Sequence, residues 1–155
     1  MQPNGFTFYS GGMYVPINEN ERFEEVRKNI LINAQIEKVW EYVATAEGIG
    51  TWFMPNDMQP IEGKEFILQA GPWGNSACKV TEVNPPNRLS FEWGKEWLIT
   101  FELKEVDGQT ELTLIHGGWN DENQTEFGES HAEVRSRMSG GWDGLVLKLK
   151  HVVEA

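Results

Sequence analysis

The sequence predicts an α+β domain in which a curved antiparallel sheet of about six strands wraps around one long C-terminal helix. From about residue 131 to residue 154, apolar residues recur every three or four positions, as on a helix with one buried face. Five short segments with alternating apolar residues precede this helix, which is typical of an antiparallel meander. One further strand and two short helical segments come before the meander.

Length and charge limit the classes of function. The chain has 155 residues, enough for one domain with a real core. Its formal net charge of -11 repels phosphate backbones and anionic lipid heads, so we expect neither nucleic acid nor a membrane as partner. No apolar run approaches the roughly 20 residues of a membrane-spanning helix. The N-terminus does not read as a secretory signal, so the expected location is the cytoplasm.

Few residues in the chain are suited to metal or cofactor chemistry. The single cysteine, Cys78, excludes an internal disulfide. The three histidines, His116, His131 and His151, are too far apart in sequence for a local metal motif. A glycine-rich phosphate loop between a strand and a helix is also missing from the sequence. We therefore expect no metal and no cofactor.

Residues 1–24 are predicted to be an appendage, and residues 25–155 the domain proper. The first segment is rich in glycine and proline and ends in a charged run. Its aromatic residues would allow docking on the main body or on a second copy of the chain: Phe6, Phe8, Tyr9 and Tyr14. A loosely held tail is the simpler interpretation and the one we expect.

The first half of the domain predicts a strand followed by helices. The strand covers residues 26–33, with Ile30 and Ile32 on one face. A helix over about residues 35–46 follows, because Ile36, Val39, Trp40 and Val43 share a helical face. Glycines at positions 48 and 50 are expected to end it, and residues 51–54 to form a short apolar turn or helix.

The meander is predicted over residues 64–70, 76–83, 88–93, 97–106 and 110–118. Asp107-Gly108 is a strong hairpin signal between the last two strands. Residues 119–130 are polar and acidic and predict a loop. The final helix then carries one apolar stripe: Val134, Met138, Trp142, Leu145, Leu149 and Val152. Gly140, Gly141 and Gly144 cost roughly 1 kcal/mol each in helix propensity, so we expect them to serve a close approach, a bend or a kink.

Seven tryptophans are unusual for this length and suggest a lined cavity, although each alone is more often core. Inward-facing positions on the strands and the last helix predict a ligand-binding set: Phe66, Leu68, Phe91, Trp93, Trp97, Ile99, Phe101, Leu114, His116, Met138, Trp142 and Leu145. Residues near turns are expected at the pocket mouth: Trp52, Phe53 and Trp73. Such a wall suits a planar or lipid-like molecule oriented by one or two hydrogen bonds.

His116 is the polar residue most suited to a role in this pocket. Alternation points it the same way as Leu112 and Leu114, so it could donate to a ligand carbonyl or act as a base. The more frequent alternative is a core histidine satisfied by the backbone or by a Trp N–H. A Cys78–His116 nucleophile pair would need contact, and a lone cysteine is usually a small buried hydrophobe. Acidic residues occupy outward positions, which argues against a paired-carboxylate site.

The order of several short motifs resembles a known superfamily. A strand ending in a small residue is followed by a helix with Val-Trp, here Ala34, Val39 and Trp40, and then by Trp52-Phe53. The last strand ends in His-x-Gly-Trp, and the final helix carries Gly-Trp with spaced leucines: His116, Gly118, Trp119, Gly141, Trp142, Leu145 and Leu149. This pattern resembles the helix-grip superfamily of the birch pollen allergen, lipid-transfer START domains and polyketide cyclases. Within it, residues 25–155 look like the branch related to the activator of the heat-shock-protein-90 ATPase.

The resemblance implies a fold more than a function, because members include carriers, cyclases, aromatase-like enzymes and co-chaperone modules. We expect non-enzymatic binding of a small hydrophobic or aromatic ligand, as a carrier or sensor, between sheet and C-terminal helix. One alternative is a protein-interaction module like a chaperone activator, with a protein partner or a homodimer. A weaker alternative is a cyclase-like or hydrolase-like enzyme that uses His116.

Overall fold

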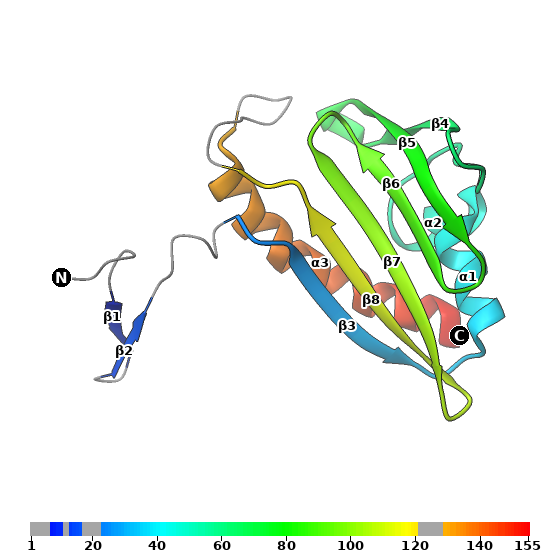
Figure 1. Ribbon diagram of the computed structural model, residues 1–155, viewed down its shortest axis with the longest axis horizontal. Coiled ribbons are helices and arrows are strands. Elements are labelled where there is room, and N and C mark those ends of the chain that lie inside the picture. Colours follow the sequence, from blue (N-terminus) through cyan, green and yellow to red (C-terminus); the bar gives the residue numbers. More distant parts are fainter. Residues whose placement is uncertain (1–6, 11–12, 17–22, 121–128) are drawn as a thin grey trace.

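The computed structural model describes residues 7–10, 13–16, 23–120 and 129–155, except the side chains of residues 7–10, 13–16 and 73. Its main sheet has six antiparallel strands in the order β3-β8-β7-β6-β5-β4 (Figure 1). The elements of the main body are β3 (Val26–Ile32), α1 (Ile36–Ala44), α2 (Ala46–Trp52), β4 (Glu65–Gln69), β5 (Asn75–Asn84), β6 (Arg88–Trp93), β7 (Trp97–Val106), β8 (Gln109–Gly117) and α3 (His131–Glu154). The predicted α+β fold with about six strands, two early helices and a long last helix is confirmed.

A separate hairpin precedes this body, formed by β1 (Thr7–Ser10) and β2 (Met13–Pro16). The aromatic side chains of the tail, and with them the choice between a loosely held and a docked tail, lie outside the described residues. Phe23 packs against the core, and the Arg135 Nε donates to the carbonyl oxygen of Glu24 at 2.7 Å. These contacts hold the chain to the main body from residue 23 onward, while a domain boundary at residue 24 stays a prediction.

The early helices differ from expectation in one respect. Gly48 and Gly50 do not end a helix but lie inside α2. The break comes at Thr45, whose backbone is extended and whose hydroxyl accepts from the Gly48 N–H at 3.0 Å. A Cβ on Gly48 would lie 2.1 Å from the Glu41 carbonyl oxygen, so glycine is needed there for α2 to pack tightly on the end of α1.

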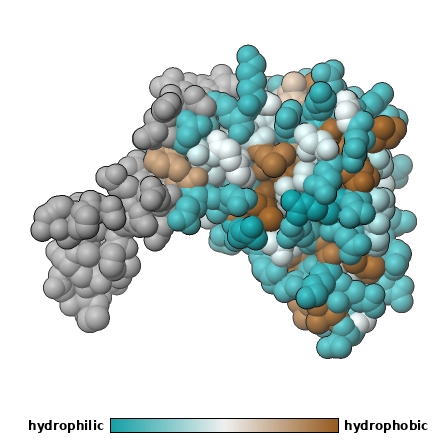
Figure 2. Space-filling model, in the orientation of Figure 1, coloured by the Kyte–Doolittle hydropathy of each residue, from teal (hydrophilic) through white to brown (hydrophobic). Residues whose placement is uncertain are grey.

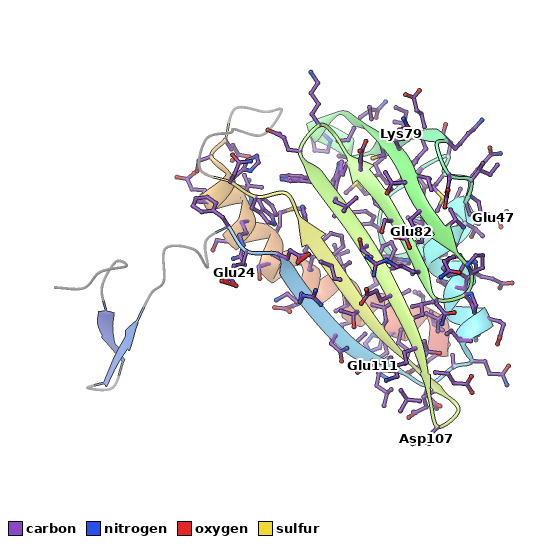
Figure 3. The ribbon with its side chains drawn as sticks, viewed as in Figure 1. Glu24, Glu47, Lys79, Glu82, Asp107 and Glu111 are labelled. Carbon is purple, nitrogen blue, oxygen red and sulfur yellow. The ribbon has the colours of Figure 1, made fainter. Side chains whose placement is uncertain are left out.

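Alternation gives the sheet one polar face and one apolar face. On the outer face, Ser90 and Thr100 share a hydrogen bond of 2.8 Å, and Arg88 pairs with Glu82 and Glu102. The same view in Figure 2 shows mostly hydrophilic side chains over the described part of the surface. Charged side chains from the strands, including Lys79 on β5, are labelled in Figure 3. The outer face is therefore satisfied by polar contacts and solvent.

Helix α3 covers the inner face and runs in the same direction as β3 (Figure 1). Three contacts fix this alignment along its length. Lys28 pairs with Asp143 at 3.0 Å, the Lys150 Nζ donates to the Leu31 carbonyl at 2.8 Å, and Glu154 accepts from the Asn33 N–H at 2.7 Å. The C-terminal end of α3 therefore lies beside the end of β3, and its N-terminal end beside the start of β3.

The buried face of α3 is slightly rotated from the predicted stripe. Val134, Trp142 and Leu149 are buried as expected, but the helix also buries Val146 and Val153, whereas Leu145, Val152 and Met138 are partly buried. The buried positions from Trp142 are spaced by four, three and four residues, so they follow the same helical period as the predicted stripe but on a slightly rotated face. The expected close approach at the three helical glycines is wrong, because a Cβ at any of them would meet nothing within 4 Å.

Candidate functional site

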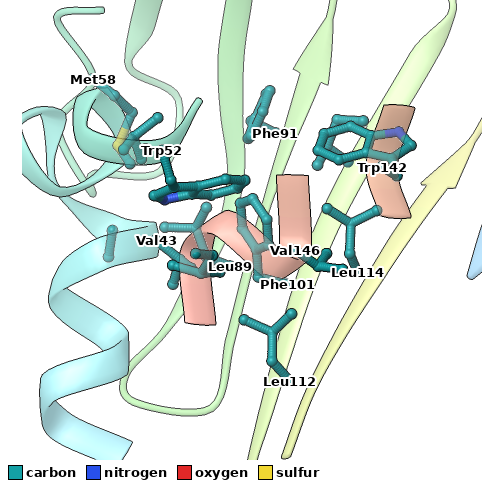
Figure 4. Close-up of a cluster of buried hydrophobic side chains, with 14 of the residues drawn as sticks. Val43, Trp52, Met58, Leu89, Phe91, Phe101, Leu112, Leu114, Trp142 and Val146 are labelled. Atoms are coloured by element: carbon teal, nitrogen blue, oxygen red, sulfur yellow. The ribbon is translucent and has the colours of Figure 1, made fainter. Parts of the chain in front are cut away.

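The layer between the sheet and α3 has two ends of different chemistry. We call one the aliphatic end, made by Ile32, Leu103, Leu112, Leu149 and Val153, all of them buried. We call the other the aromatic cluster, made by Trp93, Trp97, His116, Trp119, His131 and Trp142. Figure 4 shows Leu112, Leu114 and Trp142 following one another from the first end toward the second.

The aromatic cluster is assembled from neighbouring strand ends and the start of α3. Trp93 and Trp97 face each other across the β6–β7 turn, with ring centroids 5.2 Å apart. The β7–β8 register places Ile99 opposite His116, whose ring lies 4.9 Å from that of Trp97. The ring of Trp119 lies 4.4 Å from that of His116. Rings from three segments therefore surround one histidine.

A glycine just after β8 makes this arrangement possible. Gly118 has a φ of 99°, and a Cβ there would lie 1.9 Å from the Glu96 carbonyl oxygen. The left-handed backbone turns the chain so that the Trp119 Nε1 donates to the His116 carbonyl at 2.9 Å. The His-x-Gly-Trp pattern is therefore the sequence signal of this cluster.

His116 is buried with 0% of its surface exposed, and it is held in one tautomer. Its Nδ1 accepts a hydrogen bond of 2.8 Å from the Trp142 Nε1–H. Burial, with the positive charge of Arg135 and the neighbouring His131, lowers the pKa of His116 to about 3. The imidazole is therefore neutral at pH 7, and because Nδ1 accepts, its single hydrogen is on Nε2.

His131, 1% exposed, has the same tautomer for a different reason. The Asn120 backbone N–H donates to its Nδ1 at 3.2 Å, which leaves the hydrogen on Nε2. Glu96 Oε2 lies 3.6 Å from this Nε2, beyond ordinary hydrogen-bond length. The predicted set did not include His131 or Trp119. The apolar period of α3, extended back one turn from Val134, was the available signal for His131.

Three buried ring nitrogens have no hydrogen-bond partner in the described part of the chain: Trp97 Nε1, His116 Nε2 and His131 Nε2. All three belong to the aromatic cluster. Elsewhere in the described residues the buried side-chain nitrogens and oxygens are paired, as Thr110 shows at the aliphatic end by donating to the Ala34 carbonyl at 2.8 Å. Because unpaired buried donors are rare in native proteins, their concentration in one place marks the cluster as a candidate binding site.

The predicted ligand-binding residues all come to the inner side of the sheet or to α3. Nine are buried and three, Trp97, Met138 and Leu145, are partly buried. Many touch one another, since Phe91 packs against Phe66 and Phe101 with ring centroids 5.2 and 6.4 Å apart. Those at the β4–β5 side therefore make core contacts, whereas Trp93, Trp97, His116 and Trp142 belong to the aromatic cluster.

The residues expected at a pocket mouth lie in different environments. Trp52 is fully buried and its Nε1 donates to the Tyr42 carbonyl at 2.8 Å, so it lies in the core rather than at a rim. Phe53 is partly buried and contacts Trp93 and Trp142, with centroids 5.6 and 5.3 Å apart. It therefore borders the aromatic cluster. The side chain of Trp73 lies outside the described residues.

The geometry disfavours several kinds of chemistry. His116 is a poor general base, because its pKa is about 3 and its Nε2 already carries hydrogen. Cys78 on β5 is three strands from His116 on β8, a distance of roughly 14 Å, so the two do not form a nucleophile pair. Within the described ranges, no three His, Cys, Asp or Glu residues are grouped to hold a metal ion. No helix of the described chain is long and apolar enough to span a membrane.

A curved sheet gripping a long C-terminal helix defines the class of the protein as a helix-grip fold. Over residues 33–154 the chain matches the family model described as "Activator of Hsp90 ATPase homolog 1-like protein". Because this match covers most of the chain, the protein belongs to that family. The sequence resemblance to this branch is thereby confirmed. No curated protein is significantly similar to the chain.

Solved structures agree with this assignment. The Bacillus halodurans protein BH1534 is 43% identical, with a TM-score of 0.77 over 85% of this chain and 98% of that one. The Aha1 dimer from Colwellia psychrerythraea is 21% identical, with a TM-score of 0.68 over 84% and 96%. DynU16, a protein of the dynemicin biosynthetic locus, is 21% identical, with a TM-score of 0.69 over 85% and 48%. At this level of sequence identity, the last two structures show a similarity of fold alone.

Proposed function

We propose that this protein binds a small, largely apolar molecule at the aromatic cluster and acts as a carrier or sensor rather than as an enzyme. The observation that carries the proposal is the concentration of unpaired ring nitrogens among aromatic rings. A layer evolved only for packing would favour apolar side chains there, because each buried donor without a partner costs about 1–3 kcal/mol. A bound molecule would repay this cost.

The position of the cluster is compatible with ligand entry. Trp97, Phe53 and Met138 are only partly buried, so this end of the layer reaches the molecular surface. The surrounding rings offer flat apolar contact, which suits a planar ligand. A fold neighbour from the dynemicin biosynthetic locus adds support for a small-molecule role. The neutral, protonated Nε2 of His116 favours binding over base catalysis.

The proposal is tested by titration with N-phenyl-1-naphthylamine, an uncharged apolar fluorophore. We expect saturable binding of one molecule per chain and quenching of tryptophan fluorescence. Trp97→Leu should weaken binding by about fivefold, because it removes an aromatic ring and an unpaired N–H from the site. The matched control is Leu98→Ala on the same strand, whose side chain is 42% exposed and alternates to the outer face.

Two results would count against the proposal. One is linear, non-saturating fluorescence, with no small molecule retained in native mass spectra of protein purified from its host. The other is equal weakening by the Trp97 and Leu98 substitutions, which would place the dye outside the aromatic cluster.

A second candidate function is that of a protein-interaction module, and family membership favours it. The described surface offers limited support. Its large exposed apolar side chains come from four different segments, β3, the α2–β4 connection, β7 and α3: Leu31, Ile61, Leu98 and Leu147. Adding the chain to a purified Hsp90 and measuring ATP hydrolysis tests this function directly. Sedimentation of the chain alone tests whether it dimerises, as the Colwellia protein does.

A further inference from the structure

We infer that Trp97, His116 and His131 form a hydrogen-bond-donor subsite that takes an uncharged acceptor oxygen of the ligand, such as a carbonyl oxygen. This inference rests on the proposed function, because it assigns the polar chemistry of the same site. It also predicts that a ligand with an acceptor oxygen binds more tightly than a ligand of similar shape whose only polar group is a donor.

The donor character of each nitrogen follows from its neighbours. Indole Nε1 always carries hydrogen, so Trp97 is a donor without choice. The hydrogen bond from Trp142 occupies the His116 Nδ1 lone pair, and the hydrogen bond from Asn120 occupies that of His131. Both imidazoles therefore present Nε2–H. The three unpaired atoms are all donors, and none of them can accept.

The three rings are neighbours in space. The Trp97 ring lies 4.9 Å from that of His116 and 6.2 Å from that of His131, measured between centroids. Trp119 packs against both histidines, at 4.4 and 5.6 Å, and uses its own N–H on the His116 carbonyl. Both indoles therefore line the subsite, but the Trp119 N–H already has an acceptor, whereas the Trp97 N–H has none among the described residues.

The surroundings favour a neutral oxygen over an anion. Glu96 Oε2 lies 3.6 Å from His131 Nε2, so a second carboxylate at the subsite would be repelled. Burying a charge among aromatic rings would add a desolvation cost. A carbonyl oxygen has two lone pairs, so it can accept from more than one of these donors without carrying a charge.

A matched pair of probes tests the inference: 2-acetylnaphthalene and 2-isopropenylnaphthalene. The two have nearly the same shape, but the second replaces the carbonyl oxygen by a CH2 group. The wild-type protein should bind the ketone about tenfold more tightly, equivalent to about 1.4 kcal/mol, although the hydrocarbon is the more apolar. Affinities are measured by quenching of tryptophan fluorescence.

Two variants assign the preference to the subsite. Trp97→Phe keeps an aromatic wall and removes only the free N–H, so the ketone preference should fall several-fold. Trp52→Phe, outside the cluster, removes an N–H that already donates to the Tyr42 carbonyl and should keep the preference. Equal affinity for both probes in the wild-type protein, or a preference unchanged in Trp97→Phe, would overturn the subsite while leaving apolar binding intact. Failure of both probes to bind would instead overturn the proposed function.

The tautomers can be measured without any ligand. Long-range ¹H–¹⁵N spectra of the imidazole rings should show hydrogen on Nε2 of both His116 and His131 at pH 7. A spectrum with hydrogen on Nδ1 of His116 would contradict its assignment as a donor, whatever the probes do.

Discussion

At the aliphatic end of the layer between sheet and α3, Leu112 and Leu149 are completely buried and carry no polar side-chain atom. The aromatic cluster includes His116 on the same strand and Trp142 on the same helix, and every residue of the cluster carries a ring nitrogen. Thr110 at the first end is hydrogen-bonded, whereas three nitrogens at the second end have no partner among the described residues. The aliphatic end therefore stabilises the fold, whereas the unpaired nitrogens of the aromatic cluster, in the same layer, destabilise it.

The difference shows where a binding site can be placed in a well-packed core. Apolar side chains packed closely at one end supply the free energy that holds the sheet to the helix. That surplus allows unpaired donors to persist at the other end, where a ligand can use them. Substitutions at the two ends should accordingly differ in what they change.

The largest effect is expected at the aliphatic end. Leu149→Ala should lower the free energy of unfolding by about 2–5 kcal/mol, because it leaves a hole in a buried part of the core. Urea denaturation measures this. Leu147→Ala on the same helix is the control, since that side chain is 47% exposed and should change stability by no more than about 0.5 kcal/mol. If Leu149→Ala lowered the free energy of unfolding only slightly, the aliphatic end would not be the stabilising part of the layer.

Acid should destabilise the protein through the aromatic cluster. The pKa of His116 is about 3 in the folded protein, below the 6.5 of an unperturbed histidine. Between these values the unfolded chain binds a proton that the folded chain does not, so stability falls as pH falls. The slope from His116 should reach about 1.4 kcal/mol per pH unit below pH 6. His116→Asn, which can still accept from Trp142, should show a shallower slope in urea titrations at pH 7, 6 and 5.

Two indoles of the cluster should respond differently to the same substitution. Trp119→Phe removes the donor to the His116 carbonyl and should cost at least about 1 kcal/mol more than Trp97→Phe, which removes an unpaired N–H. Thermal unfolding of the two variants makes the comparison. Equal costs would mean that the Trp97 N–H is satisfied in solution.

The smallest effect is expected on the exposed side of α3. Gly144→Ala should raise the free energy of unfolding by about 0.5–1 kcal/mol, because the position is helical and exposed and a Cβ meets nothing within 4 Å. Ligand affinity at the aromatic cluster should not change. Destabilisation would show that the helical glycines have a role that the packing does not reveal.

Much of the fold followed from periodicity and turn chemistry. Alternation located all six strands of the main sheet, and Asp107-Gly108 formed the expected hairpin, with both residues at positive φ. The helix ends were harder to predict, because whether Gly48 ends a helix or lets one pack depends on Glu41, a tertiary neighbour. The buried face of α3 shifted by one residue at Val146 for the same reason, since the sheet selects the face.

The candidate site was predictable only in part. Strand alternation brought Trp93, Trp97 and His116 to one face, as the structure has them. Which nitrogens are paired depends on contacts between β8 and α3, such as Trp142 to His116, that no spacing reveals. Nothing in the sequence around Trp52 distinguishes a tryptophan in the core from one at the mouth of a pocket.

The alignment of α3 with β3 also has a consequence for how the chain folds. The hydrogen bonds that hold α3 along β3 join positions 111, 119 and 121 residues apart. Among the described residues, β3 pairs in the sheet only with β8. Such long-range closure slows folding, because chain entropy is lost before the contacts form. Until α3 docks, the apolar inner face of the sheet is exposed to water. The nascent protein is then at its most vulnerable to aggregation.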